Sequence, residues 1–314
     1  MAATMGLNAL ALRSSRVRAL IETGKPGITR LVAITAVVGF VLAALGQVWT
    51  FGLLASLASC VVGTVLSSLG ANALNEWWER ERDAKMARTA GRPIPRGELS
   101  AASVLGFGLG SSAAGVGLLL VVNGPGAALV ALVCVLSYVL VYTPLKPLTV
   151  TSTLVGAIPG ALPPLIGWAA ASEAGSLASL TEPGGWSLVA LMTIWQLPHF
   201  LAIAWMYRDD YAAGGFRVLP VVDPSGRATA ITILVTAVLL VPATMLPVWA
   251  MPGLLGGATL VVALLTGLAY LWLAVKLAIS RTRPAARRVF FASIIHLPVL
   301  LLVIVAEAVG RTLL

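Results

Sequence analysis

The sequence predicts an all-α, multi-pass membrane protein, and three observations lead to this fold class. Of the 314 residues, 59% are hydrophobic and only 11% are charged, which is unusual for a soluble domain. The mean hydropathy is +0.96. The apolar residues form continuous runs, whereas the strands of a membrane β-barrel would alternate. Because lipid offers the backbone no hydrogen-bond partners, such runs are expected to be helices.

Nine of the runs are long enough, or nearly so, to cross a bilayer, which takes about 20 apolar residues. They cover residues 28–46, 51–75, 102–122, 126–143, 151–171, 187–207, 228–248, 253–275 and 289–309. We expect residues 1–314 to form a single integral-membrane domain, with residues 1–25 as a cytoplasmic N-terminal arm.

The basic residues sort by loop. If the N-terminus is cytoplasmic, 20 of the 21 Lys and Arg fall in segments on the cytoplasmic side, and only Arg311 does not. This sorting follows the positive-inside rule and predicts a cytoplasmic N-terminus and an external C-terminus. It also explains the net charge of +9 without a nucleic-acid partner.

Charged residues are concentrated in the segment 72–97, NALNEWWERERDAKMARTAGRPIPRG. Asn75, Glu79 and Asp83 are four apart, so on a helix their oxygen-bearing side chains form one stripe. Such oxygens suit Mg²⁺, whose coordination shell is usually completed by water and substrate phosphates. The segment also holds six basic residues, which a Gly- and Pro-rich loop can fold over a bound anion. The alternative, a solvated charged loop, stays open at this point.

Polar residues also gather at the cytoplasmic ends of other predicted spans. Lys25 precedes the first span, and Tyr142 and Lys146 are four apart at the end of the fourth. Each lysine is either a topology anchor or a ligand. Residues 208–211, Arg-Asp-Asp-Tyr, follow the sixth span. Two acidic helix ends that face one compartment can share a diphosphate through Mg²⁺ ions.

The fifth and sixth spans contain unusual residues for membrane helices. Three prolines and three glycines interrupt the fifth span, GAIPGALPPLIGWAA, which is therefore expected to be kinked or broken. Broken helices in membranes usually line a cavity. In the sixth span, Gln196 and His199 lie within apolar sequence, where a polar group needs partners or a cavity. Taken alone, His199 is more often a satisfied core residue than a ligand.

A family resemblance rests on six stretches of the sequence. They are Lys25-Pro26, NEWWERERDAKMARTAGRPIPRG, YTPLK, GAIPGALPPLIGWAA, WQLPHFLAIAW and RDDYAAGGF. In combination they resemble the UbiA-type intramembrane prenyltransferase superfamily and, within it, the protohaem IX farnesyltransferases, or haem o synthases. The superfamily pattern Asn-x3-Asp-x3-Asp reads here Asn75, Glu79, Asp83. The second motif, often Asp-x3-Asp, has Asp210 followed by Gly214, a departure that resembles the haem branch.

The resemblance implies nine helices around a central cavity and a reaction in which farnesyl diphosphate and haem b give haem o and diphosphate. It implies Mg²⁺ as cofactor, held by Asn75, Glu79, Asp83 and Asp210. The implied catalytic residues are these four and Lys146. The implied diphosphate contacts are Lys25, Arg88, Arg92, Tyr142 and Arg208. His199 is the candidate on the haem side.

The resemblance also implies a location and partners. We expect the bacterial inner membrane, with a haem a synthase or terminal-oxidase assembly factors as candidate protein partners. Two alternatives stay open: a sister prenyltransferase that acts on an aromatic acid, a quinone precursor or a chlorin, and a multi-pass transporter with broken helices. Against the transporter, the acidic groups gather at one face of the membrane rather than at its midplane.

Overall fold

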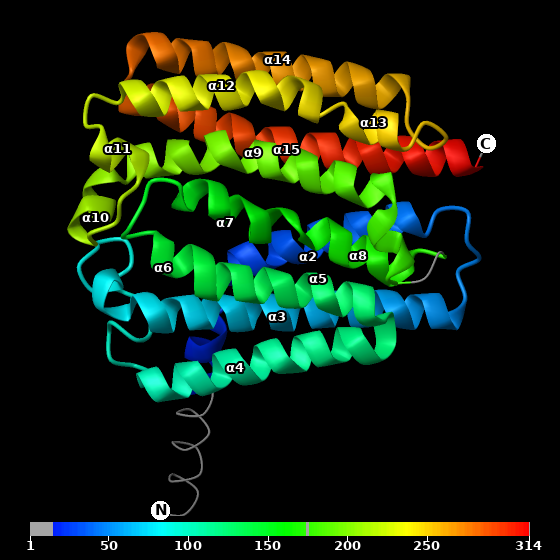
Figure 1. The fold of residues 1–314 in the computed structure, drawn as a ribbon, viewed down its shortest axis with the longest axis horizontal. Coiled ribbons are helices and arrows are strands. Elements are labelled where there is room, and N and C mark those ends of the chain that lie inside the picture. Colours follow the sequence, from blue (N-terminus) through cyan, green and yellow to red (C-terminus); the bar gives the residue numbers. More distant parts are fainter. Residues whose placement is uncertain (1–14, 174–175, 314) are drawn as a thin grey trace, which may run out of the picture.

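The computed structural model of the protein describes residues 15–173 and 176–313. Within these ranges the chain has no β-strand, and nine helical segments are long and apolar enough to cross a membrane, as the sequence predicts. The helices lie side by side along the long axis of the molecule (Figure 1). Most of the predicted N-terminal arm, residues 1–14, lies outside the described residues, and residues 15–23 are helical.

The helices follow one another in the order of the predicted spans. The α-helices are α2 (Pro26–Ala43), α3 (Phe51–Asp83), α4 (Ala101–Leu118), α5 (Pro125–Leu136), α6 (Thr143–Leu145), α7 (Ser152–Ala161), α8 (Pro163–Ala171), α9 (Pro183–Met206), α10 (Arg208–Ala213), α11 (Leu219–Val222), α12 (Arg227–Ala243), α13 (Leu246–Ala250), α14 (Gly257–Ser280) and α15 (Arg283–Leu313). Two π-helical segments, η1 (Leu119–Asn123) and η2 (Ser137–Tyr142), extend α4 and α5, and η3 (Ala178–Thr181) is a 3₁₀ helix.

The fifth and sixth spans form the centre of the bundle. The share of buried residues is 72% in the span made of α7 and α8 and 67% in α9, against 28% in α3, α4 and α14. Helix α9 contacts α7 on one side and α12 and α15 on the other. It therefore joins the half formed by α2–α8 to the half formed by α12–α15 (Figure 1).

The predicted break in the fifth span is confirmed. Helix α7 ends at Ala161 and α8 starts at Pro163, with Leu162 between them. Pro163 and Pro164 have no N–H to continue the hydrogen bonds of α7, so the chain changes direction there.

Helix α8 packs against α2 almost backbone to backbone. A Cβ placed on Gly39 would come within 1.9 Å of the Pro164 carbonyl oxygen, and one on Gly167 within 1.8 Å of the Ala36 carbonyl oxygen. Glycine is required at both positions because any side chain would separate the two helices. Such small-residue contacts replace the hydrophobic driving force that helices lack in lipid.

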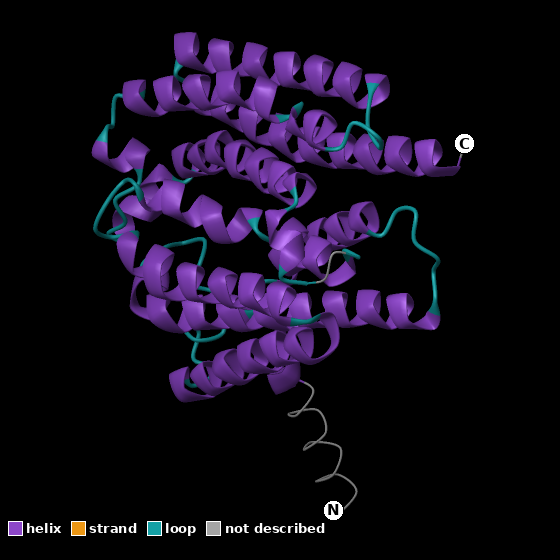
Figure 2. Cartoon of the chain, turned by 45° about the vertical axis from the view of Figure 1, so that its right-hand side comes forward, coloured by secondary structure: helices purple, strands orange, loops and turns teal. Residues whose placement is uncertain are grey.

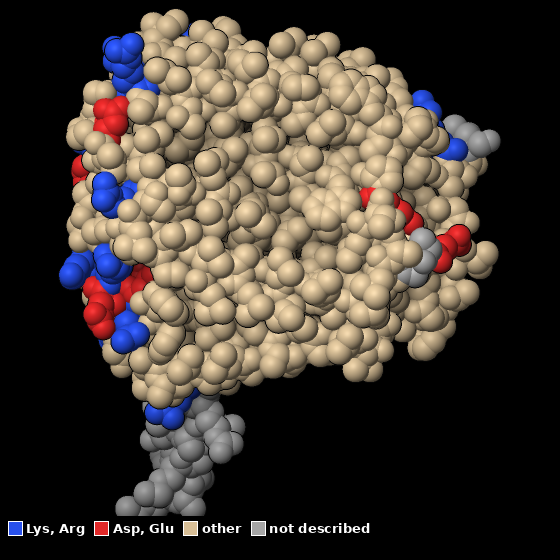
Figure 3. Space-filling model, viewed as in Figure 1, with Lys and Arg blue, Asp and Glu red and all other residues tan. Residues whose placement is uncertain are grey.

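Charged residues collect at the two ends of the bundle and leave a wide uncharged band between them (Figure 3). We call the more charged end, where α3, α9 and α14 finish, the polar end. Arg311, near the end of α15, lies at the opposite end. Both views of the ribbon place the connecting loops at these ends (Figures 1 and 2). This distribution is the one expected of a multi-pass membrane protein.

Two helices are longer than hydropathy predicts. Helix α3 continues from the predicted end at residue 75 to Asp83, and α15 begins at Arg283 rather than at residue 289. The added residues are mainly Glu, Arg and Ala, which form helices well in water. A helix can therefore leave the membrane without ending, and α3 carries the predicted oxygen stripe out to the polar end.

Candidate active site

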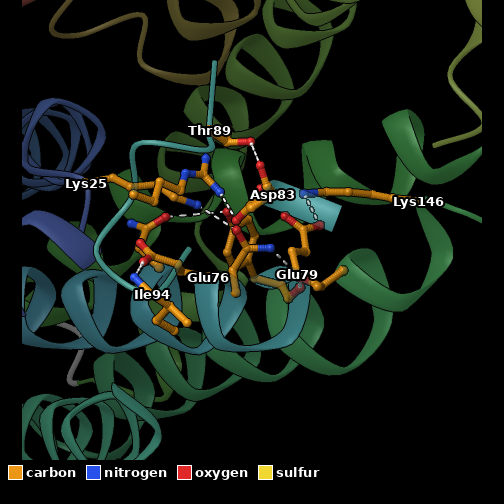
Figure 4. A network of polar contacts seen from close by, with 12 residues as sticks. Lys25, Glu76, Glu79, Asp83, Thr89, Ile94 and Lys146 are labelled. Carbon is orange, nitrogen blue, oxygen red and sulfur yellow. Dashed lines mark hydrogen bonds and ion pairs between the residues drawn. The ribbon is translucent and has the colours of Figure 1, made fainter. Parts of the chain in front are cut away.

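The last turns of α3 carry the predicted stripe, and its side chains are buried. The exposed fractions of Asn75, Glu79 and Asp83 are 1%, 5% and 0%. Buried carboxylates are costly unless opposite charges or hydrogen-bond donors compensate them. Each of the three side chains meets a cation from a different part of the chain (Figure 4).

Lys25 lies just before α2 and reaches the first of these oxygens. Its Nζ donates to Asn75 Oδ1 at 2.6 Å, while Asn75 Nδ2 donates to Thr143 Oγ1 at 3.0 Å. Burial lowers the pKa of Lys25 to about 7, and the positive charges of Arg92 and Lys146 contribute in the same direction. Lys25 is therefore a lysine that can gain or lose its charge near neutral pH.

Lys146 follows α6 and pairs with the second residue of the stripe. Its Nζ lies 2.7 Å from Glu79 Oε1 and 4.5 Å from the centre of the Tyr142 ring. Burial alone would lower the pKa of Lys146, but Glu79 and then the Tyr142 phenol outweigh it, so this pKa is raised. Gly156 on α7 makes room for the tyrosine, because a Cβ there would come within 2.5 Å of the ring. Lys146 is thus held charged against Glu79.

The loop of residues 84–100 folds back over α3 and supplies the third cation. Arg92 Nη1 lies 2.5 Å from Asp83 Oδ2. Thr89 Oγ1 donates to the Asp83 main-chain oxygen at 2.9 Å, and the Ile94 N–H donates to Glu76 Oε1 at 3.1 Å. These bonds fix the loop over the stripe (Figure 4). The loop thus brings Arg92 to the stripe, while the expectation that its basic residues cover a bound anion stays a prediction.

The oxygens of the stripe fit Mg²⁺ in chemistry, although they do not form a ready-made metal cluster. Asp83 Oδ1 is buried and has no hydrogen-bond partner among the described residues. Hard carboxylate and amide oxygens are the ligands that Mg²⁺ prefers. Within residues 15–173 and 176–313, however, no three His, Cys, Asp or Glu side chains gather closely enough to hold a metal ion. The assignment of Asn75, Glu79, Asp83 and Asp210 as metal ligands stays a prediction.

The region of α10, which carries the second acidic cluster, contacts both the end of α3 and the loop that follows it. Arg82 Nη1 donates to the Gly214 carbonyl at 3.0 Å. The Arg88 guanidinium lies 5.2 Å from the centre of the Tyr207 ring and 5.5 Å from that of Tyr211. The two polar segments that the sequence predicts to share a ligand are therefore neighbours at the polar end.

Two predicted residues of this region do not contact the stripe. The Asp210 side chain is half-buried on α10 and makes no ion pair or hydrogen bond with any residue in the described part of the chain. Arg208 is exposed, and its guanidinium lies 3.3 Å from Asp209 Oδ1 and 3.4 Å from the Pro224 carbonyl. Arg208 would have to change rotamer to reach a ligand on α3.

His199 lies within α9, away from the stripe. It is seven residues before Met206 at the end of the helix, or about 10 Å at 1.5 Å per residue. Its Nδ1 lies 2.6 Å from Ser293 Oγ on α15, and its ring stacks on those of Trp195 and Phe290. These contacts fit the alternative that His199 is a core histidine that has a hydrogen-bond partner within the protein. A role of His199 on the haem side stays a prediction.

Sequence reasoning missed uncharged residues on which the packing of the neighbouring side chains depends. Gly156 and Gly160 are four apart on α7, and a Cβ on Gly160 would come within 2.0 Å of Gln196 Oε1. Small residues four apart mark a face of close helix packing, so this signal was present in the sequence. Thr143, which accepts from Asn75, gave no comparable signal because its partner is 68 residues away.

Comparison with known proteins identifies the family. Residues 32–295 match the model of the UbiA prenyltransferase family. The chain belongs to this family. It is 43% identical to the protoheme IX farnesyltransferase of Solibacter usitatus (strain Ellin6076) over 295 residues, which cover 90% of this chain and 96% of the relative. It is 40% identical to the protoheme IX farnesyltransferase of Opitutus terrae over 283 residues, with 90% of this chain and 91% of the relative covered.

Solved structures share the fold of this UbiA-family chain. A digeranylgeranylglyceryl phosphate synthase matches 94% of this chain and 99% of its own with a TM-score of 0.76 at 14% identity. A UbiA homologue from Archaeoglobus fulgidus bound to GPP and Mg²⁺ matches 94% of this chain and all of its own with a TM-score of 0.63 at 11% identity. The predicted fold class is thus confirmed, and the central cavity stays a prediction.

Proposed function

We propose that this UbiA-family protein transfers the farnesyl group of farnesyl diphosphate to a vinyl group of haem b and so makes haem o for terminal oxidases. Relatives named protoheme IX farnesyltransferase, 40–43% identical over 90% of the chain, support the choice of substrates. The structural observation that carries the proposal is the buried oxygen stripe of α3, with one cation from each of three separate segments. Such a site suits an anion and a divalent cation together.

The stripe and its cations would exchange partners when substrate binds. Lys25, Arg92 and Lys146 would turn from the oxygens of α3 to the oxygens of the diphosphate. When bound, Mg²⁺ would be held by Asn75, Glu79, Asp83 and Asp210 and would neutralise charge on the leaving diphosphate. Arg88, Tyr142 and Arg208 are the further diphosphate contacts, and Arg208 would reach it through a new rotamer.

The reaction balances without an oxidant. The bond between farnesyl C1 and oxygen breaks, and its electron pair leaves with the diphosphate, where the side chains of Lys25, Arg92 and Lys146 stabilise the growing negative charge. The π electrons of the haem vinyl group form the new C–C bond with the farnesyl cation. Water then adds to the remaining carbocation and releases one proton. On the apolar side, His199 in α9 is the proposed contact with haem.

The charge distribution supports an orientation in the membrane. We place the polar end on the cytoplasmic side of a bacterial inner membrane and the C-terminus of α15 outside, because basic residues are retained inside. Farnesyl diphosphate would then bind from the cytoplasm. A haem a synthase or terminal-oxidase assembly factors would be the protein partners that receive haem o.

The test uses the purified full-length chain in detergent with haem b, farnesyl diphosphate and Mg²⁺. Haem o is expected by mass spectrometry, together with diphosphate release. Asp83→Asn should lower the release rate by roughly 100-fold, the scale of losing one group that stabilises transition-state charge. Glu81→Gln is the matched control, since Glu81 lies on the same helix and is exposed.

Two outcomes would contradict the proposal. If Asp83→Asn inserted normally and released diphosphate at the wild-type rate, the stripe would not be the site of ionisation. If the chain prenylated an aromatic acid and gave no product from haem, it would be a sister prenyltransferase with another acceptor.

A further inference from the structure

A second group of basic residues lies at the polar end, on helices that do not carry the stripe. It comprises Arg227 on α12, Lys276 on α14, Arg281 after α14, and Arg283, Arg287 and Arg288 on α15. Two hollows of about 320 Å³ each open among these helices. One lies between α14 and α15 and the other between α12 and α14. Both combine cations with apolar walls, but only the first also offers hydroxyl groups, those of Ser280 and Thr282, so it is the stronger candidate for a binding site.

The hollow between α14 and α15 has both polar and apolar walls. Lys276 and Arg288 line it together with Ser280, while Leu273, Ile279 and Pro284 form apolar parts of its wall. Its volume can hold a phosphate-sized group and the atoms bonded to it.

The two cations that line this hollow have no acidic partner in the described part of the chain. In residues 15–173 and 176–313, the side chains of Lys276 and Arg288 form no ion pair with a carboxylate. The cations over the α3 stripe, in contrast, each have an oxygen partner. Positive charge without an internal partner is complementary to an anion that comes from outside the chain.

The surface next to the hollow is exposed and apolar, as expected of a surface that faces lipid. Trp272 and Ile279 on α14 and Ile295 on α15 are exposed large hydrophobic residues. The Lys276 ammonium lies 3.6 Å from the centre of the Trp272 ring, an aromatic residue of the kind that sits at membrane interfaces. An occupant with a charged head at the hollow can place apolar chains along these helices.

We propose that the hollow between α14 and α15 binds the headgroup phosphate of an anionic phospholipid. Lys276 and Arg288 contact the non-bridging phosphate oxygens, and Ser280 donates a hydroxyl hydrogen bond to the headgroup. The acyl chains lie along the exposed faces of α14 and α15. Basic residues immediately beside a membrane helix attract anionic lipids. This site is separate from the stripe, so it does not rest on the proposed reaction.

The test is native mass spectrometry of the delipidated full-length protein with phosphatidylglycerol, phosphatidylcholine or inorganic phosphate added. Phosphatidylglycerol is expected to bind preferentially. The double variant Lys276→Gln with Arg288→Gln should bind it about 30-fold more weakly, at about 1 kcal/mol for each cation near the surface. The control, Arg283→Gln with Arg287→Gln, removes the same charge from α15 residues outside the hollow and should weaken binding clearly less than the hollow variant.

Each other outcome overturns the proposal. Equal losses in the two double variants would show diffuse attraction to a charged surface, and equal binding of phosphatidylcholine would show no selectivity for an anion. Saturation by millimolar inorganic phosphate, with no gain from acyl chains, would indicate a free-anion site. A changed KM for haem b in the Lys276/Arg288 variant with unchanged lipid binding would assign the hollow to haem carboxylates.

The charge-preserving pair Lys276→Arg with Arg288→Lys should keep lipid binding, which separates lost charge from failed folding.

Discussion

Replacing Lys146 with Met is expected to destabilise the protein more than replacing Lys146 and Glu79 together. The two groups lie 2.7 Å apart, with 14% and 6% of their side chains exposed. Removing only the lysine leaves a buried carboxylate without its cation, which costs about 3–5 kcal/mol. The double variant Lys146→Met with Glu79→Gln removes both charges, and its free energy of unfolding is expected within about 1 kcal/mol of the wild type.

The assay measures unfolding in mixed detergent micelles with increasing SDS, alongside diphosphate release. Both variants should lose diphosphate release, since both lack the charge proposed to stabilise the leaving diphosphate, so stability and catalysis separate. Removing the exposed pair Arg80–Glu81 serves as control and should change stability by less than about 1 kcal/mol. A double variant as unstable as the single one would refute the argument from the buried charge. So would a Lys146→Met protein as stable as the Arg80–Glu81 control.

Three further predictions follow from the same contacts. The pKa of Lys25 is about 7, and a bound diphosphate favours its charged form, so affinity for farnesyl diphosphate should fall by up to about tenfold per pH unit above 7. Lys25→Arg, which stays charged, should flatten this pH profile of KM. Gly156→Ala should displace the Tyr142 ring and cost about 1–3 kcal/mol in SDS unfolding, whereas Gly106→Ala, with no neighbour within 4 Å, should not destabilise. By calorimetry, Mg²⁺ should bind at least about tenfold more tightly with an unreactive farnesyl diphosphate analogue than alone; equal affinities would contradict partner exchange.

Hydropathy predicted the spans because every helix that crosses a bilayer needs a stretch of about 20 predominantly apolar residues. It did not predict where the helices end outside the membrane. Residues 76–83 are rich in Glu and Arg, which hydropathy excludes from a span but which continue α3 without interruption. The broken fifth span was predictable because Pro163 and Pro164 cannot continue a helix, whatever surrounds them.

The stripe was predictable because spacing along one helix is local information, but its partners were not. Lys25 and Asn75 are 50 residues apart, and only the packing of α2 on α3 brings them together. The family resemblance implied Arg88 and Arg208 as diphosphate contacts, without information on where either side chain lies. The structure distinguishes them, since Arg88 stacks on two tyrosines beside α10 and Arg208 points to an exposed carbonyl.

The pairing of the stripe would make binding of the proposed metal and of the diphosphate depend on each other. Mg²⁺ alone would add two positive charges next to Lys25, Arg92 and Lys146, in a buried place where charges are weakly screened. A diphosphate alone would add negative charge next to Glu79 and Asp83. With both bound, the oxygens of Glu79 and Asp83 would face Mg²⁺ and the three cations would face the phosphate oxygens. Each added charge would then meet an opposite charge, so the proposed site would favour the complete magnesium diphosphate over either part.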